Sequence, residues 1–84
     1  MVVLFYVYMV ECRDGTIYTG WTKDVEKRIS RHNSGQGAKY TKSRLPVRLR
    51  HVEEFPTKEE AMSREYSIKK LTRKDKLHLF GQCH

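Results

Sequence analysis

The fold is decided by one stretch, Tyr6-Val7-Tyr8-Met9-Val10-Glu11-Cys12-Arg13-Asp14-Gly15-Thr16-Ile17-Tyr18-Thr19-Gly20. β-Branched and aromatic residues stand on both sides of an Asp-Gly pair, a pattern that strongly predicts a β-hairpin. The first run of the hairpin begins at Val2 and is apolar almost without a break. Such a run indicates a central strand that is covered on both faces. We therefore expect the rest of the chain to pack around this hairpin.

The length of the turn decides where the tyrosines point. A two-residue turn would place Tyr8 and Tyr18 on opposite faces of the sheet, because side chains alternate along a strand. A three-residue turn over 13–15, with Gly15 left-handed, places both tyrosines on one face. It also sets Tyr8 opposite Gly20, which leaves room above the backbone. The sequence permits both turns, and we expect the three-residue one.

The composition predicts one domain that binds a polyanion. Eighty-four residues leave room for a single domain. The net charge is +7, and the positive charge is clustered: residues 23–50 hold nine Lys or Arg against two acidic residues, and residues 64–76 hold six against two. Clustered cations bind phosphates and release counterions, so nucleic acid is the expected partner. The alternative is a surface that serves only solubility.

The sequence gives no sign of export or membrane insertion. The apolar start is about ten residues long, too short for a membrane span, and it lacks a basic leader and a small-residue cleavage site. Cys12 and Cys83 are too few for a disulfide framework and do not form a metal-type pair. We expect a reduced, cytoplasmic setting and no membrane contact.

A first helix is expected over 23–33, with Thr22 as its N-cap. Arg28 and His32 are four residues apart on this helix, so both can point to the same rim of the sheet. Lys27 and Arg31 are candidate phosphate ligands on the same helix.

The glycine-containing segment 35–46 is expected to form a surface loop. Its basic residues Lys39, Lys42 and Arg44 are candidate phosphate ligands. Tyr40 either stacks on a base or anchors the loop by packing beneath it, and the sequence leaves both open.

A third strand at a sheet edge is expected over 47–55, followed by a helix that a Thr57–Glu60 capping box opens. The helix runs to about residue 70, and Glu65 falls within the apolar face that must pack on the sheet. A carboxylate there is costly unless it is paired or binds a cation. The alternatives are a salt bridge to Arg28 or Lys69, a rim position that reaches water, or a metal ligand, which we favour.

A short last helix is expected over 72–80, with 81–84 as a frayed tail. The predicted fold is thus α+β, with a small three-stranded, mostly antiparallel sheet packed by about three helices in the order β-β-α-β-α-α.

The hairpin motifs resemble the paired signature of the GIY-YIG nuclease family. Tyr6-Val7-Tyr8 is followed after about ten residues by Tyr18-Thr19-Gly20, and the downstream matches are Arg28, His32 and Glu65. The likeness covers nearly the whole chain, which is similar to the small stand-alone members of the family. Two positions depart from the signature: Tyr6 replaces its glycine, and Thr19 replaces its middle isoleucine.

The resemblance implies a divalent-metal-dependent endonuclease that hydrolyses phosphodiester bonds in DNA, in repair or in processing of DNA structures. Tyr8 or Tyr18 would orient or deprotonate water, and the other tyrosine would hold a phosphate or a hydrated metal. Arg28 would stabilise developing charge, and His32 would assist proton transfer or phosphate binding. Glu65 would hold one Mg²⁺ or Mn²⁺ ion, and Lys69 is a further candidate nucleic-acid ligand.

Two other functions fit the same sequence. The first is a nucleic-acid-binding module that keeps the scaffold without turnover. The second is a small interaction subunit that docks a larger partner through a sheet edge. Nucleases of the family usually gain targeting from an attached DNA-binding domain, so a larger protein partner is one candidate source of targeting here.

Overall fold

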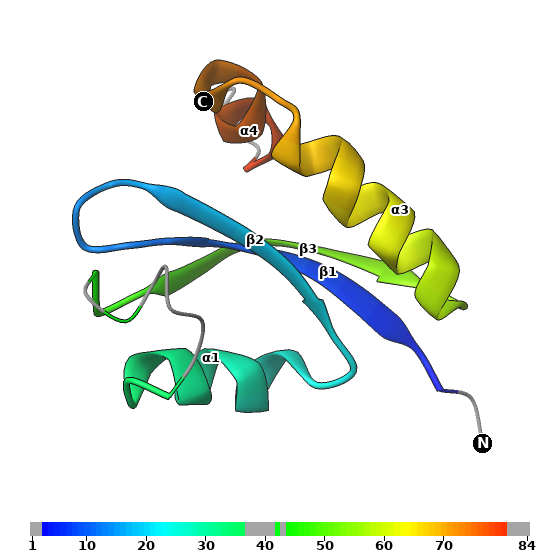
Figure 1. Cartoon of the computed structure of the whole chain (residues 1–84), viewed down its shortest axis with the longest axis horizontal. Helices are drawn as coiled ribbons and strands as arrows, with labels where there is room; N and C mark the ends of the chain where they lie inside the picture. The colour runs from blue at the N-terminus through cyan, green and yellow to red at the C-terminus, as the bar shows by residue number, and fades with distance from the viewer. Residues whose placement is uncertain (1–2, 37–41, 43, 81–84) are drawn as a thin grey trace.

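The computed structural model describes residues 3–36, 42 and 44–80, which form a three-stranded antiparallel sheet with helices on both faces (Figure 1). The elements are β1 Phe5–Glu11, β2 Ile17–Thr22, α1 Val25–Asn33, β3 Arg48–Phe55, α3 Lys58–Lys69 and α4 Arg73–Leu79. The strands lie in the order β2-β1-β3, with α1 on one face of the sheet and α3 and α4 on the other. The expected α+β class and element order are confirmed. The expected tail at 81–84 lies outside the described residues.

The hairpin has the three-residue turn. Tyr8 lies opposite Gly20 and Val10 opposite Tyr18. The Cys12 N–H donates to the Thr16 carbonyl at 2.8 Å, and Gly15 has a φ of 85°. A residue with a side chain would be strained at that φ, so the glycine at position 15 allows the three-residue turn. Tyr8 and Tyr18 therefore share one face of the sheet, as expected.

The middle strand contributes to both layers of the core. Val7 and Met9 pack with Ala61 and Ile68 of α3, on one face. On the other face, Tyr8 and Val10 pack with Cys12 and Val47. Alternate β1 side chains thus fill opposite layers, and this explains why the first run of the hairpin is apolar at nearly every position.

The helix starts follow capping chemistry, with one correction. Thr57 is the N-cap of α3, as expected: its hydroxyl accepts from the Glu60 N–H at 3.2 Å, and it also donates to the Glu60 carboxylate at 3.0 Å. The expectation that Thr22 caps α1 was wrong, since Asp24 accepts the Lys27 N–H at 3.1 Å. Thr22 is still part of β2, so the helix begins two residues later than expected.

Thr19 carries a buried hydroxyl that lacks a hydrogen-bond partner among the described residues. Its side chain is on β2 and the residue is 3% exposed. We expect Thr19→Val, which replaces the hydroxyl with a methyl group of the same shape, to raise the free energy of unfolding by about 1 kcal/mol. Urea denaturation measures this change. A decrease of about 1 kcal/mol instead would show that the Thr19 hydroxyl has a hydrogen-bond partner in solution.

Candidate active site

A pocket of about 480 Å³ opens beside β2 and collects side chains from four elements. It is lined by Tyr8, Tyr18, Gly20, Trp21, Thr22, Lys23, Arg28 and Glu65. Tyr8 comes from β1, Arg28 from α1 and Glu65 from α3, so residues far apart in the sequence meet here. Four of the five predicted catalytic residues therefore line one pocket.

The two tyrosines both line the pocket and lie close together. Their ring centroids are 6.4 Å apart. Tyr8 is 1% exposed, whereas Tyr18 is half-buried. A Cβ atom at Gly20 would lie 2.6 Å from the Tyr8 hydroxyl oxygen, far inside normal contact. Only glycine at position 20 lets the Tyr8 ring lie flat against β2 with its hydroxyl at the pocket.

His32 lies behind the tyrosines and is fully buried. Its Nε2 atom is 3.1 Å from the Tyr8 hydroxyl oxygen, at hydrogen-bonding distance. Its ring centroid is 5.4 Å from that of Tyr18, with the two rings in an edge-on arrangement. Arg28, one helical turn earlier, lines the pocket instead. The sequence placed Arg28 and His32 along one edge of the helix. In the structure Arg28 lines the pocket, whereas His32 is buried beneath the tyrosines.

Burial keeps the Tyr8–His32 pair uncharged at neutral pH. Burial raises the pKa of Tyr8, with a further contribution from the nearby Tyr18, so the phenol stays protonated. Burial also lowers the pKa of His32, and the positive charges of Arg28 and Arg31 act in the same direction. The pair is therefore a neutral phenol hydrogen-bonded to a neutral imidazole.

The half-buried carboxylate of Glu65 stands at the pocket wall. Its side chain is 20% exposed, and its Oε2 atom lies 3.5 Å from the Nζ atom of Lys69, one turn further along α3. The ion pair to Lys69 that the sequence left open is therefore present. Lys69 itself is 52% exposed, so its side chain can leave Glu65 without cost from burial.

The donor set at Glu65 fits one hard divalent cation. Among residues 3–36, 42 and 44–80, no cluster of three or more His, Cys, Asp or Glu side chains could form a protein cage for a metal. Mg²⁺ does not need one, because it commonly uses one or two carboxylates and completes its shell with waters and phosphate oxygens. The open pocket in front of Glu65 leaves room for both.

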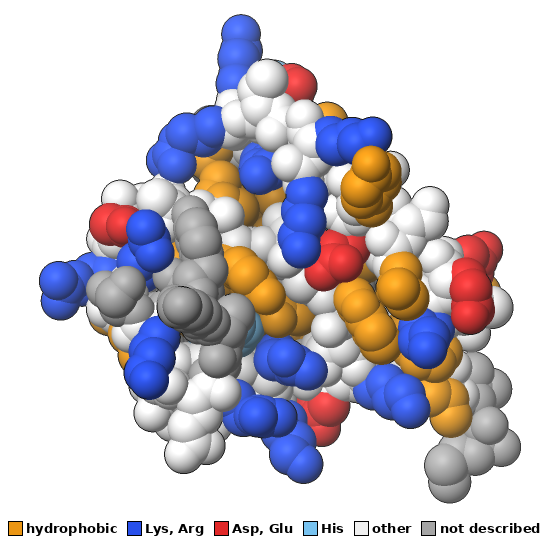
Figure 2. Space-filling model, viewed as in Figure 1, with side chains coloured by type: hydrophobic (Ala, Val, Ile, Leu, Met, Phe, Trp, Pro, Cys, Tyr) orange, Lys and Arg blue, Asp and Glu red, His pale blue; other side chains and the backbone are white. Residues whose placement is uncertain are grey.

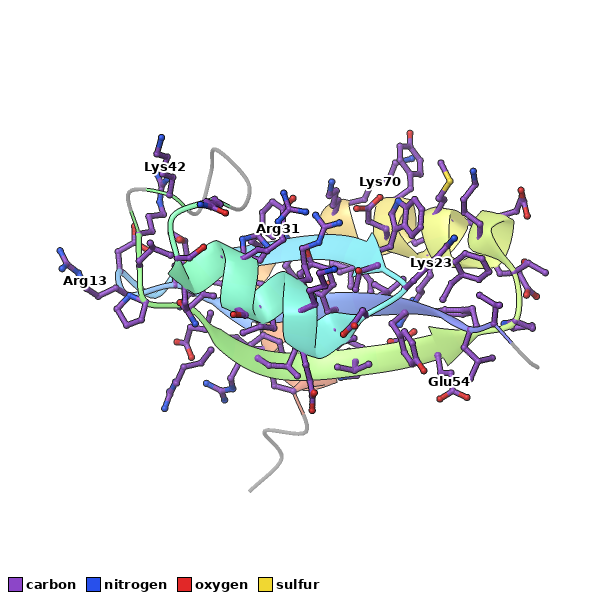
Figure 3. All side chains as sticks on the ribbon, turned by 90° about the horizontal axis from the view of Figure 1, so that it is seen from below. Arg13, Lys23, Arg31, Lys42, Glu54 and Lys70 are labelled. Atoms are coloured by element: carbon purple, nitrogen blue, oxygen red, sulfur yellow. The ribbon has the colours of Figure 1, made fainter. Side chains whose placement is uncertain are left out.

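Positive side chains gather on the β2 side of the sheet. In Figure 3, Lys23, Arg31, Lys42 and Lys70 all lie on that side, whereas Glu54 lies beyond β3 on the opposite side. Figure 2 shows the same face from the front, with Lys and Arg side chains spread over it from α1 to α4. The pocket thus opens onto a surface suited to a polyanion.

The remaining predicted nucleic-acid ligands fall into three groups. Lys27 and Arg31 line a small hollow on α1 next to the pocket, together with Arg28. Arg44 forms an ion pair with Asp14 of the hairpin turn, with its Nε atom 3.0 Å from Oδ2, while Lys42 is exposed. Lys39 and Tyr40 lie outside the described residues.

Three pocket residues, Trp21, Thr22 and Lys23, were not predicted as site residues in the sequence analysis. They follow Gly20 at the end of β2, where the strand leaves the sheet and turns into α1. The available signal was their position directly after the second tyrosine motif, because a strand end beside a site supplies lining residues.

Protonation of His32 is expected to destabilise the fold. Its pKa is lowered in the folded protein, so the unfolded chain takes up the proton first as the pH falls. Stability should be fully present above about pH 6.5 and decline below it, through the folded-state pKa. Glu53, whose pKa Arg64 lowers by hydrogen bonding, contributes only in the more acidic range below the ordinary carboxyl value.

Urea denaturation at about pH 7.5 and about pH 5.5 measures the effect. His32→Gln keeps a hydrogen-bonding side chain without a titrating ring, so it should be less stable at the higher pH but lose less between the two. A pH dependence equal to that of the parent would show that another group is responsible.

Residues 4–78 match the model of the GIY-YIG catalytic domain, and the chain belongs to the GIY-YIG family. Within that family it is similar to UPF0213 proteins. One from Halobacterium salinarum is 57% identical over 77 residues, covering 92% of this chain and 100% of the relative. One from Clostridium perfringens is 60% identical over 76 residues, covering 90% of this chain and 82% of the relative.

Two solution NMR structures share the fold. The UPF0213 protein from Bacillus halodurans has 51% sequence identity and a TM-score of 0.61, over 95% of this chain and 85% of that one. A protein from E. faecalis has 44% identity and a TM-score of 0.62, over 96% of this chain and 90% of that one. No helix among residues 3–36, 42 and 44–80 is long and apolar enough to span a membrane.

Proposed function

We propose that this protein is a divalent-metal-dependent endonuclease that hydrolyses phosphodiester bonds in DNA, in repair or in processing of DNA structures. The observation that carries the proposal is the pocket that joins two tyrosines, an arginine and a carboxylate around one open volume. Phosphodiester hydrolysis needs a base for water, positive charge on the phosphate and help for the leaving oxygen. Each need has a matching group in this pocket.

The Tyr8–His32 pair is proposed as the base. When Nε2 of His32 is unprotonated, the imidazole takes the Tyr8 proton while the Tyr8 oxygen takes a proton from the attacking water. The water oxygen then forms a bond to phosphorus, and the bond to the leaving oxygen breaks. The step starts from the uncharged pair and leaves the proton on His32, and the low pKa of His32 favours its return through Tyr8 to the leaving oxygen or to water. Tyr18, which is more open to the pocket, holds the water or a phosphate oxygen by its hydroxyl.

Arg28 is proposed to bind the phosphate and to stabilise the negative charge that develops on it. Glu65 is proposed to hold one Mg²⁺ or Mn²⁺ ion. A bound ion of this kind supplies Lewis-acid polarisation of the phosphate and stabilises the leaving oxygen. For the ion to bind, Lys69 must release Glu65, after which its ammonium group is free to pair with a phosphate.

The alternative function is a nucleic-acid-binding module without turnover. The contact that favours it is the 3.5 Å ion pair between Lys69 and Glu65, which occupies the carboxylate with an internal cation. In that case the basic β2 side of the sheet would bind DNA, and added metal would change nothing. A larger protein partner could supply targeting in either case.

The test compares two arginine variants that remove the same charge. Arg28→Ala should lower the cleavage rate by about 100-fold or more, because it removes a transition-state contact. Arg48→Ala is the matched control, since its side chain is 76% exposed on β3, the strand at the edge opposite β2. Cleavage by the control should stay near the parental rate. Equal rates for both variants would remove Arg28 from the reaction.

A further inference from the structure

A face of α3 continues the pocket outward as an exposed strip. Met62, Glu65, Tyr66 and Lys69 stand at spacings of three and four residues, so they share one side of the helix. Glu65 belongs to the pocket, whereas Tyr66 is 62% exposed and Met62 is 45% exposed. Tyr66 is the most exposed large hydrophobic residue of the described ranges. Tyr66 and Met62 together form exposed apolar surface beside the pocket residue Glu65, and contiguous surface of this kind marks interaction sites.

The strip combines an aromatic ring and a methionine side chain with positive charge. The Nζ atom of Lys70 lies 4.3 Å from the centre of the Tyr66 ring, and Lys69 stands one turn beyond Glu65. Trp21, half-buried, lines the pocket on the β2 side. Figure 2 shows hydrophobic side chains exposed in a band among Lys and Arg side chains. Aromatic rings interleaved with cations are the pattern that binds unpaired nucleotides, bases on the rings and phosphates on the cations.

We propose that one stacking strip, consisting of Trp21, Met62, Tyr66, Lys69 and Lys70, binds unpaired bases that flank the phosphate held in the pocket. The inference rests on the proposed function and names its substrate class: single-stranded segments, overhangs or flaps rather than continuous duplex. Bases within a duplex are stacked on each other and present only their edges, so they cannot stack on Tyr66. An unpaired strand offers both base faces and backbone phosphates.

The charge on the strip decides between the candidate occupants. A second copy of this chain would bring Lys69 and Lys70 against the same two residues, and such like-charge contacts are costly. Single-stranded nucleic acid supplies a negative charge at every nucleotide beside a flat base. The strip also borders the pocket, where Trp21 and Glu65 are lining residues, so a strand held in the pocket can continue over it.

The test measures binding in the absence of divalent metal, so that it does not depend on cleavage. Trp21 is the sole tryptophan, and stacking of a base near it should quench its emission. The probes are an oligothymidine of roughly ten nucleotides and a blunt hairpin duplex with a similar number of phosphates. Tyr66→Ala should weaken oligothymidine binding at least about fivefold and leave duplex binding nearly unchanged. Tyr66→Phe should bind like the parent, because it keeps the ring.

Two further variants separate stacking from charge. Val52→Ala on β3 removes an exposed apolar side chain of 39% exposure away from the strip and should change nothing. Lys70→Gln should reduce the salt dependence of oligothymidine binding by about 0.7 in slope, the value of one phosphate contact, whereas Tyr66→Ala should not. An oligouridine of equal length serves as the RNA arm, and tighter binding of either strand assigns the source of the unpaired segment.

The inference is overturned if Tyr66→Ala binds oligothymidine like the parent, or if it loses duplex affinity equally. It is also overturned if sedimentation shows a dimer that Tyr66→Ala dissociates, because the strip would then be an interface between copies. Two results together would contradict the substrate class and leave the proposed function standing. Tyr66→Ala would cleave duplex at the parental rate, and the parent would cleave single strands no faster than duplex. Binding of single strands that depends on Tyr66, without cleavage of any substrate, would contradict the proposed function and leave the stacking strip standing.

Discussion

Replacing Glu65 with glutamine is expected to lower metal-dependent cleavage by about 100-fold or more, with DNA binding retained. Glutamine has the size of glutamate but lacks the charge that holds a divalent cation. Loss of the ion pair with Lys69 should change the stability only slightly. Lys69 is 52% exposed, and helical pairs one turn apart contribute about 0.3–0.5 kcal/mol. Stability should therefore stay within about 0.5 kcal/mol of the parent.

Glu54→Gln is the matched control, because it removes the same charge from an exposed position on the other side of the molecule (Figure 3). Its cleavage rate should be that of the parent. Cleavage and urea denaturation are measured on both variants. A clear loss of stability in Glu65→Gln with cleavage intact would show that Glu65 is a structural partner of Lys69 rather than a metal ligand.

Gly20→Ala is expected to damage both fold and activity although it adds one methyl group. The new Cβ atom would lie 2.6 Å from the Tyr8 hydroxyl oxygen and 2.8 Å from the ring carbon that carries it. Tyr8 is 1% exposed and cannot swing into solvent, so the ring or β2 must shift. Overpacking of this kind costs about 1–3 kcal/mol. The shift also separates Tyr8 from His32, so cleavage should fall by about tenfold or more.

A double-mutant cycle with Tyr8→Phe tests the cause. Removing the hydroxyl removes the closest contact, so the cost of Gly20→Ala should be smaller in the Tyr8→Phe background than in the parent. Free energies of unfolding for the four proteins give the coupling. Costs that simply add would show that Gly20 is required by the backbone and not by Tyr8.

The hairpin could be predicted from sequence because its determinants are local. The residue pattern offered only two turns, and they put Tyr8 and Tyr18 either on opposite faces or on the same face. The structure has Gly15 at a φ of 85° and Tyr8 opposite Gly20, as the longer turn requires. The central position of β1 was likewise predictable, since its side chains are buried on both faces and leave an unbroken apolar run.

The site was only partly predictable because it depends on how helices dock. Helical spacing placed Arg28 and His32 on one side of α1, but it could not show that α1 packs closely enough to bury His32 completely. The same spacing placed Glu65 among apolar neighbours, and the docking of α3 brought it to the pocket, where it pairs with Lys69. Trp21 and Lys23 line the pocket because of the direction in which β2 leaves the sheet, and their position directly after the second tyrosine motif was the available sign of it.

The central claim is tested most directly by metal-dependent turnover on a panel of labelled single-stranded, duplex, flap and branched DNA and RNA. The protein is in excess over each substrate, with Mg²⁺, with Mn²⁺ or with a chelator, and Arg28→Ala purified in parallel controls for contaminating nucleases. The proposed function predicts cleavage products of DNA that require the divalent ion and are absent with Arg28→Ala. Salt-sensitive binding to the whole panel, with no product under any metal condition, would contradict it.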